Sequence, residues 1–290
     1  MRNVTIFYFS GTGNTAYVAN QIGSAFSGKD SICQLVPMEN VLLKRTGIDL
    51  ENTDYVGIGF PVHAMDAPDI VYRFVDLLPT GNFKFFIFKT AGDPMLNGGS
   101  SYHLREKLRI KAWKCIYDSL FVMPSNVGNN PNPEMIKHLA LIAVKHASKM
   151  VTDILTGKIV NEPKSNIVGL FRLFGKLESK GAKKNSDRWR VNEDCIHCGK
   201  CVSNCPTKNI TSEGTKLVFG KTCIWCFRCC FHCPTQAIMM SKMFDKMRIK
   251  PYNIERILEE PAIRSDFFEH ATPQHYVRFR KHFQELGLMD

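Results

Sequence analysis

Five mainly apolar runs punctuate the first half of the chain, and segments with helical periodicity separate several of them. Three of these runs are apolar almost without interruption, which is typical of strands buried on both faces of a parallel sheet. Between the runs, apolar residues recur at the spacing of one helical face in residues 18–26 and again in 70–77. Strands that alternate with helices predict an α/β fold with a parallel sheet. The runs cover residues 4–9, 31–36, 55–60, 83–88 and 114–122.

The character of the chain changes after a longer helical pattern over residues 133–155. The following stretch begins amphipathic and becomes basic, and most of the cysteines come after it. The cysteine-rich part contains an internal repeat, because its two halves end in CPTKNI and CPTQAI. A last helix is predicted near 273–287. We therefore expect four parts: a first domain over 1–156, a linker over 157–188, a cysteine domain over 189–240 and a helical C-terminal extension over 241–290.

The composition indicates a globular protein inside the cell. The chain has 290 residues, of which 44% are hydrophobic, so it can form ordinary cores. No apolar run reaches the roughly 18 residues that a membrane helix needs. The N-terminal run VTIFYF is too short for the apolar part of a signal peptide, and SGTGNT stands where a cleavage site would follow. We expect a cytoplasmic protein, in which clustered thiols are metal ligands rather than disulfides.

The loop after the first apolar run is suited to an anion. It contains two glycines and three hydroxyl side chains and opens the first predicted helix, whose free N–H groups attract negative charge. No lysine follows, so it is not a P-loop, and Ala16 replaces the third glycine of a dinucleotide site. A turn that only caps the helix is the alternative. The candidate residues are Ser10, Gly11, Thr12, Gly13, Asn14 and Thr15.

This loop, Ser-x-Thr-Gly-x-Thr after a first strand, resembles the FMN-phosphate loop of flavodoxins. The resemblance implies a five-stranded, doubly wound sheet of order 2-1-3-4-5, with two further loops that hold the flavin ring at the carboxyl edge. Many flavodoxins stack Trp or Tyr on the ring, and these two loops have neither, so Phe60, His63 or Met65 could substitute. The implied ring-binding residues are Phe60, Pro61, Val62, His63, Ala64 and Met65, then Thr90, Ala91, Gly92 and Asp93.

Nine of the eleven cysteines lie between Cys195 and Cys233, and eight of them form a repeated motif. Each copy reads Cys-x-x-Cys-x-x-Cys-x-x-x-Cys-Pro, the motif of two-cluster ferredoxins, in which the fourth cysteine binds the other cluster. A pair of zinc sites is the alternative, although zinc usually uses two separated cysteine pairs. The motif predicts one [4Fe–4S] cluster on Cys195, Cys198, Cys201 and Cys233, and a second on Cys223, Cys226, Cys229 and Cys205.

Cys230 is the ninth cysteine of this region and has no place in the repeated motif. We expect it to be a small packing residue, with a substitute ligand or a redox role as the alternative.

Residues 1–240 as a whole resemble the flavodoxin–ferredoxin fusions of anaerobes known as EFR-type ferredoxins. Besides the loop and the cysteines, the segments GFPVHAMDAP and MPSN (123–126) carry this resemblance. It implies a flavodoxin-like domain with FMN, followed by a small α+β ferredoxin domain with two clusters. The leading hypothesis is a low-potential electron relay between the clusters and FMN, serving redox partner proteins. The alternatives are an FMN-dependent reductase of a small acceptor and a redox-sensing or interaction module.

The net charge of +11 is concentrated in the linker. Residues 157–188 hold eight basic and three acidic side chains and so account for +5. Two clusters and a flavin phosphate would add about −6, so the basic charge does not indicate nucleic-acid binding. The linker is either a solvated basic connector or, over residues 166–180, an amphipathic helix. Such a helix could join the two domains, bind an acidic partner or make a peripheral membrane contact.

Overall fold

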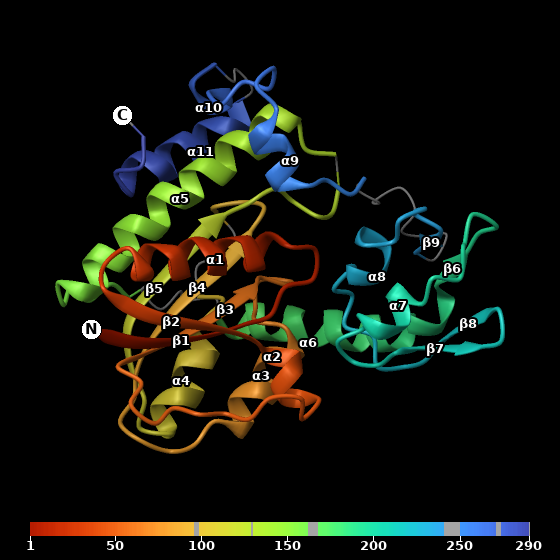
Figure 1. Ribbon diagram of the computed structural model, residues 1–290, viewed down its shortest axis with the longest axis horizontal. Helices are drawn as coiled ribbons and strands as arrows, with labels where there is room; N and C mark the ends of the chain where they lie inside the picture. Colours follow the sequence, from red (N-terminus) through yellow and green to blue (C-terminus); the bar gives the residue numbers. More distant parts are fainter. Residues whose placement is uncertain (96–98, 129, 162–167, 241–249, 271–273, 290) are drawn as a thin grey trace.

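The first half of the chain forms a five-stranded parallel sheet of order β2-β1-β3-β4-β5, as predicted (Figure 1). The computed structural model describes residues 1–95, 99–128, 130–161, 168–240, 250–270 and 274–289. In β1, Ile6 and Phe7 are buried, because the strand lies inside the sheet with helices on both faces. The strands are β1 (Arg2–Tyr8), β2 (Ser31–Pro37), β3 (Tyr55–Pro61), β4 (Lys84–Ala91) and β5 (Lys114–Val122).

Helices cover both faces of this sheet, and each face has its own hydrophobic cluster. Val18, Ile22 and Phe26 of α1 (Asn14–Ser27) are completely buried, and α1 packs beside α5 (Pro133–Leu155) on one face. The helix α5 begins after Asn132, whose side chain accepts a hydrogen bond from the Glu134 N–H at 2.8 Å. The opposite face is covered by α2 (Met38–Leu42), α3 (Asp69–Leu77) and α4 (Tyr102–Ile110).

The helix α6 (Val168–Lys184) leads from the flavodoxin-like part to the cysteine region. Residues 166 and 167 of the segment considered above as an amphipathic helix lie outside the described residues. Ala182 is buried, whereas Leu173 and Leu177 are exposed. Near its end, Lys183 lies 3.5 Å from the carboxylate of Asp69, at the start of α3. No helix among the described residues combines the length and the apolar character needed to cross a membrane.

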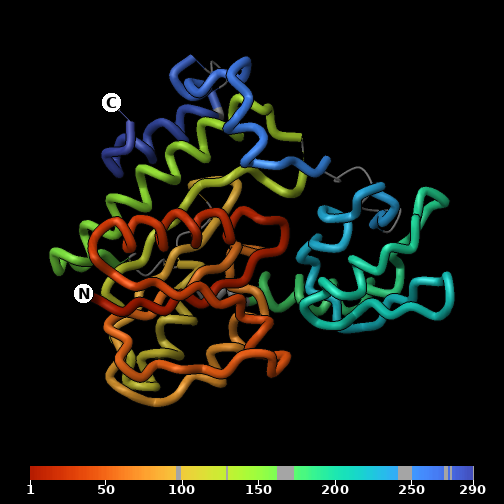
Figure 2. The backbone as a smooth tube through the Cα atoms, viewed as in Figure 1, coloured from red at the N-terminus to blue at the C-terminus, as the bar shows by residue number. Residues whose placement is uncertain are grey.

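The cysteine region is a small α+β unit at the edge where the sheet strands end (Figures 1 and 2). Its two ends meet in the antiparallel pair β6 (Arg190–Val191) and β9 (Ile238–Met239). Between them lie the hairpin of β7 (Ile210–Glu213) and β8 (Lys216–Phe219), and two short helices that contact each other. These helices, α7 (Lys200–Ser203) and α8 (Arg228–Phe231), occupy equivalent places in the two repeats, and each contains the third cysteine of its repeat.

The C-terminal extension returns to the first domain and lies over α5 (Figure 2). It contains α9 (Ile254–Glu259), α10 (Phe267–His270) and α11 (Gln274–Glu285). Phe268, Phe279 and Phe283 are buried in one cluster with Leu120 of β5 and Leu139 of α5. The extension is therefore part of the body of the protein.

Candidate functional site

A cavity of about 250 Å³ lies at the carboxyl edge of the sheet. Loops that follow β1, β3, β4 and β5 form most of its wall, and residues from α6 and the cysteine region complete it. The carboxyl edge of an open α/β sheet is the usual place for a ligand. The residues of the wall are Ser10, Gly11, Thr12, Asn14, Thr15, Pro61, Val62, His63, Ala64, Thr90, Ala91, Gly92, Met123, Pro124, Ser125, Asn126, Val127, Glu178, Trp225, Cys226 and Phe227.

The loop between β1 and α1 has the geometry of an anion site. Gly13 has φ 112°, a left-handed conformation that suits glycine, and it directly precedes α1. Its N–H donates to Ser10 Oγ at 3.2 Å, and Asn126 Nδ2 donates to Thr12 Oγ1 at 2.6 Å. The first turn of α1 has no acidic residue, so the positive end of the helix is not neutralised there. This cradle of hydroxyls and N–H groups fits a phosphate.

Most of the predicted flavin residues gather around this cavity, but four do not line it. Phe60 is completely buried in the core, and Gly13 only shapes the turn. Met65 lies in the tight turn between His63 and Asp66, with φ 66°. Asp93 forms an ion pair with Arg278 of α11.

His63 and Glu178 line the cavity in neutral or partly neutral forms. Burial lowers the pKa of His63 to about 4, so this imidazole is neutral at pH 7. Burial also raises the pKa of the Glu178 carboxyl to about 7. None of the described residues of the wall is a lysine or an arginine. A bound phosphate would therefore be held by hydroxyl and N–H donors rather than by a basic side chain.

The sequence did not indicate that part of this wall comes from beyond the first domain. Glu178 of α6 and three consecutive residues of the second cysteine repeat, Trp225, Cys226 and Phe227, line the cavity. The segment MPSN (123–126), which carries part of the resemblance to the fusion proteins, supplies the wall after β5. Large aromatic residues between the cysteines of the second repeat were the available signal for the remaining wall.

The cysteine region surrounds a second, smaller cavity of about 70 Å³. Four cysteines that are up to 38 positions apart line it together: Cys195, Cys198, Cys201 and Cys233. The pairing of β6 with β9 brings the last of these next to the first repeat. Burial would raise the pKa of the Cys233 thiol, but hydrogen bonds from the Thr235 side chain and from the N–H groups of Thr235, Ala237 and Ile238 outweigh it and lower that pKa.

The remaining four motif cysteines form a more buried group. The pKa of Cys226 is raised to about 12, mainly by burial; Arg228 lowers it, and the nearby Cys223 and Cys205 contribute to the rise. The N–H of Asn209 donates to Cys205 Sγ at 3.1 Å. Thiols that gather in a buried place with N–H donors suit a thiolate-bound cluster, which needs such hydrogen bonds to its sulfurs.

The side chain of Cys230 contacts residues of the second cysteine repeat, to which Cys230 itself belongs. Its thiol lies 3.2 Å from the carbonyl oxygen of Phe227, to which it donates, and the hydrogen bond that the Cys229 thiol donates to Cys230 raises the pKa of Cys229. It is half-buried and does not line either of the two cavities described above.

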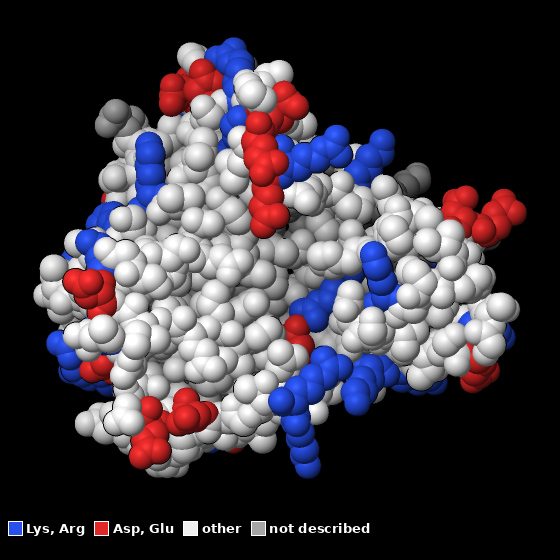
Figure 3. All heavy atoms as spheres, viewed as in Figure 1, with Lys and Arg blue, Asp and Glu red and all other residues white. Residues whose placement is uncertain are grey.

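The cysteine region contacts the loop of residues 10–15, the candidate phosphate-type loop, directly. Arg228 Nη1 lies 2.6 Å from Glu39 Oε1, and its Nη2 donates to the carbonyl oxygen of Ser10. A Cβ atom on Gly11 would collide with the carbonyl oxygen of Cys226, so the two backbones approach as closely as glycine permits. On the face in Figure 3, Lys and Arg side chains gather along the lower side of this junction, whereas Asp and Glu are more frequent at the far ends.

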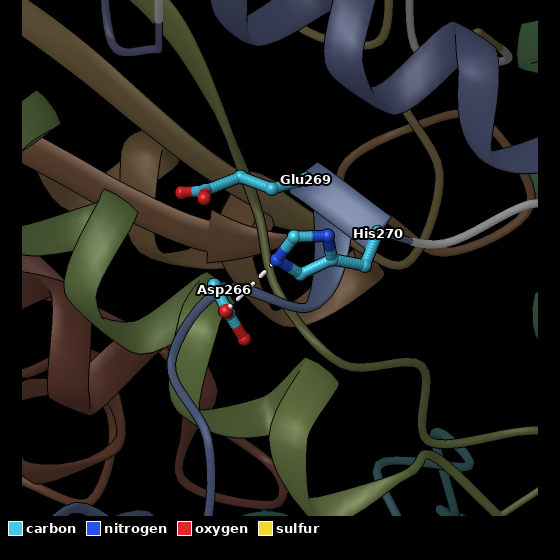
Figure 4. A group of neighbouring side chains, drawn as sticks. All are labelled: Asp266, Glu269 and His270. Carbon is cyan, nitrogen blue, oxygen red and sulfur yellow. Dashed lines mark hydrogen bonds and ion pairs between the residues drawn. The ribbon is translucent and has the colours of Figure 1, made fainter.

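One other group of side chains could in principle hold a cation. Asp266, Glu269 and His270 lie close together at α10 (Figure 4). The carboxylate of Asp266 is already engaged by Arg264 at 2.8 Å, which lowers its pKa to about 2, and by His270 at 3.1 Å. The group lies at the surface and is distant in sequence from every predicted site, so we assign no metal to it.

Together, the fold and these two cavities suit a class of protein that joins a flavodoxin-like domain to a 4Fe–4S binding region. Comparisons with protein families agree with this class. Residues 5–94 match a flavodoxin domain, and residues 190–211 match a 4Fe-4S binding domain. The first part of the chain is thus flavodoxin-like, and the cysteine region contains a 4Fe–4S binding motif.

The similar proteins cover different shares of the chain. The uncharacterized protein MJ0298 of Methanocaldococcus jannaschii is 33% identical over 67 residues, which are 23% of this chain and 45% of that protein. The chain therefore spans less than half of this curated relative. Oxidised flavodoxin 1 from Bacillus cereus is 16% identical, with a TM-score of 0.38 over 52% of this chain and 97% of its own. Rubredoxin oxygen:oxidoreductase from Desulfovibrio gigas is 16% identical, with a TM-score of 0.39 over 54% and 36%.

Proposed function

We propose that this chain is an electron-transfer protein of the flavodoxin–ferredoxin fusion type, which relays electrons between two [4Fe–4S] clusters and FMN. The observation that carries the proposal is the composition of one cavity wall. Cys226, a predicted cluster ligand, lines the same cavity as the phosphate-type loop of residues 10–15. A cluster ligand and a flavin site that share one wall give the short separation that electron exchange requires.

The residues of the larger cavity fit FMN. The loop of Ser10 to Thr15 at the start of α1 would hold the phosphate through hydroxyl and N–H donors. The loops of Pro61–Ala64 and Thr90–Gly92 would hold the ring, and they contribute backbone groups and mainly small side chains. The cavity volume of about 250 Å³ is close to that of the smaller ligand pockets of proteins.

The cysteines fit two four-iron clusters with exchanged fourth ligands. Cys195, Cys198, Cys201 and Cys233 around the smaller cavity support the first cluster. The second is supported by the proximity of the other four cysteines, because Cys205 raises the pKa of Cys223 and Cys226, and Cys223 and Cys226 raise that of Cys229. When bound, the clusters exchange single electrons and the flavin takes one or two, so the pair can connect one-electron carriers with two-electron chemistry.

The proposal is tested on the intact protein, purified and reconstituted without oxygen. We expect about eight iron atoms, about eight sulfides and one FMN per chain, from two four-iron clusters and one flavin site. After rapid mixing with a stoichiometric reductant, the cluster and flavin absorbance should reach a common redox equilibrium. Zinc in place of iron, or reduced clusters that never equilibrate with bound FMN, would overturn the proposal.

A further inference from the structure

The two cysteine repeats have the same spacing but lie in different surroundings. Ile196 follows the first cysteine of the first repeat and is 63% exposed, whereas its equivalent in the second repeat, Ile224, is 9% exposed. Ile224 packs into the hydrophobic cluster on the α2–α4 face of the sheet. Likewise Cys198 is exposed, and its equivalent Cys226 is half-buried at the cavity wall. The first repeat therefore faces outwards and the second faces the flavodoxin-like domain.

The residues between the cysteines also differ between the repeats, because those of the second repeat are larger and face the flavodoxin-like domain. Where the first repeat has Gly199 with φ 70°, the second has Phe227 with φ 58°. Glycine adopts this left-handed conformation without steric cost, but phenylalanine does not. His197 and Trp225 also have positive φ, at 52° and 49°, so the repeats differ at these positions in the side chain rather than in the backbone. Phe227 belongs to the wall of the proposed flavin cavity.

The next pair of equivalent positions differs in size as well. His197 of the first repeat lines only cavities of the cysteine region, whereas Trp225 lines the flavin cavity. The indole also reaches α6, because a Cβ atom on Gly181 would lie 3.8 Å from its ring. The two ring-binding loops of the first domain contribute no Trp or Tyr, and Phe60 points into the core instead.

We infer that Trp225 and Phe227 are flavin-contact residues, so that the second cysteine repeat completes the FMN site with the aromatic surface that the first domain lacks. This inference rests on the proposed function. It places the cluster of Cys205, Cys223, Cys226 and Cys229 beside FMN. The cluster of Cys195, Cys198, Cys201 and Cys233 then faces outwards, where the exposed Ile196 and Cys198 are accessible to a redox partner protein.

The test measures the affinity of the cluster-loaded protein for FMN after removal of the flavin, by titration of flavin fluorescence. An aromatic contact with a planar ring predicts that Trp225→Ala weakens FMN binding by about tenfold or more and restores part of the quenched fluorescence. Phe227→Gly should also weaken FMN binding, although glycine adopts the left-handed conformation of this position without steric cost. The matched control is His197→Ala at the position equivalent to Trp225, which should leave the affinity within about twofold, less than the tenfold of one aromatic contact.

The iron content separates a local effect from loss of the fold. If both Trp225→Ala and Phe227→Gly keep their iron and bind FMN as tightly as the parent protein, the inference is wrong. A parent protein that holds its clusters but binds no FMN would instead contradict the proposed function. Cys198→Ser tests the arrangement of the clusters. It should cost about four iron atoms, one cluster, and leave FMN affinity unchanged, and a loss of FMN affinity would contradict an outward-facing first cluster.

Discussion

Arg228 is the single residue that most directly fixes the cysteine region to the first domain, and its removal should open the interface. Its guanidinium pairs with Glu39 at 2.6 Å, donates to the carbonyl of Ser10 and lies 5.6 Å from the ring centre of Phe9. The two charged side chains are only 15% and 10% exposed. Water therefore screens this ion pair much less than a surface pair.

The free-energy cost of replacing Arg228 can be estimated from the charge that the substitution leaves unpaired. Arg228→Met keeps the apolar stem but leaves the Glu39 carboxylate without its cation, and Glu39 Oε2 already lacks a partner among the described side chains. Breaking a buried pair in this way costs about 3–5 kcal/mol. We take the lower end, about 3 kcal/mol, because both side chains retain some exposure. This corresponds to an increase of about two orders of magnitude in the opening of the interface.

Hydrogen exchange of the holoprotein, followed by mass spectrometry, measures this opening. Amides of residues 9–13 and 226–232 should exchange about a hundredfold faster in Arg228→Met, in line with an opening cost of about 3 kcal/mol. Adding Glu39→Gln should recover a large part of the protection, because the uncompensated charge is then gone. Lys200→Met, at the equivalent position of the first repeat, is the control and should change nothing. An Arg228→Met protein with parent-like protection of both segments would refute the reasoning.

Three further changes test separate parts of the structure. Gly11→Ala would force its Cβ against the Cys226 carbonyl and should reduce FMN affinity and interface protection, whereas Gly47→Ala, in open space, should not; equal behaviour of the two would contradict the close approach. Burial lowers the pKa of His146 to about 3, and the unfolded chain binds this proton below about pH 6.5. The free energy of unfolding should therefore decrease as the pH is lowered from about 6.5 towards 3, and this group contributes up to about 1.4 kcal/mol per pH unit. Urea unfolding of His146→Gln should show a shallower slope, and an unchanged slope would refute this. Lys89→Met removes the 3.0 Å partner of the buried Asp118, which keeps Arg105 at 3.4 Å, and should cost about 3 kcal/mol in urea unfolding; the double variant with Asp118→Asn should recover only part of this cost, because Arg105 then loses this ion pair, and a single-variant cost below about 1 kcal/mol would contradict the prediction.

The sheet could be predicted from sequence because its strands have a local signature. A strand buried on both faces needs an apolar run, and each run found in the sequence lies on one of β1 to β5. The order of the strands followed from the resemblance to flavodoxins rather than from the runs themselves. The loop before α1 was also predictable, because Gly13 sits where the backbone needs a positive φ.

The part of the proposed flavin cavity wall that comes from α6 and the second cysteine repeat could not be predicted in the same way. It depends on contacts between distant single residues, such as Arg228 with Glu39, and these contacts have no periodicity in the sequence. The same reason explains why Asp93, a predicted flavin residue, does not line the cavity. Asp93 forms an ion pair with Arg278, which belongs to a C-terminal extension that the flavodoxin resemblance does not cover. Phe227 was the usable signal, because a bulky residue replaces the glycine of the first repeat.

Tyr252 shows that the extension takes part in the same site. Its hydroxyl lies 3.0 Å from the side-chain oxygens of both Asn14, at the start of α1, and Asn126, in the loop after β5. Its ring meets Phe231 of α8 edge-on, with the ring centres 5.2 Å apart. Burial raises the Tyr252 pKa, so the hydroxyl keeps its proton and remains a donor. A glycine-containing phosphate loop has little intrinsic order. Since one neutral tyrosine contacts this loop, the β5 loop and the second repeat, the extension helps to hold the three walls of the proposed FMN site in register.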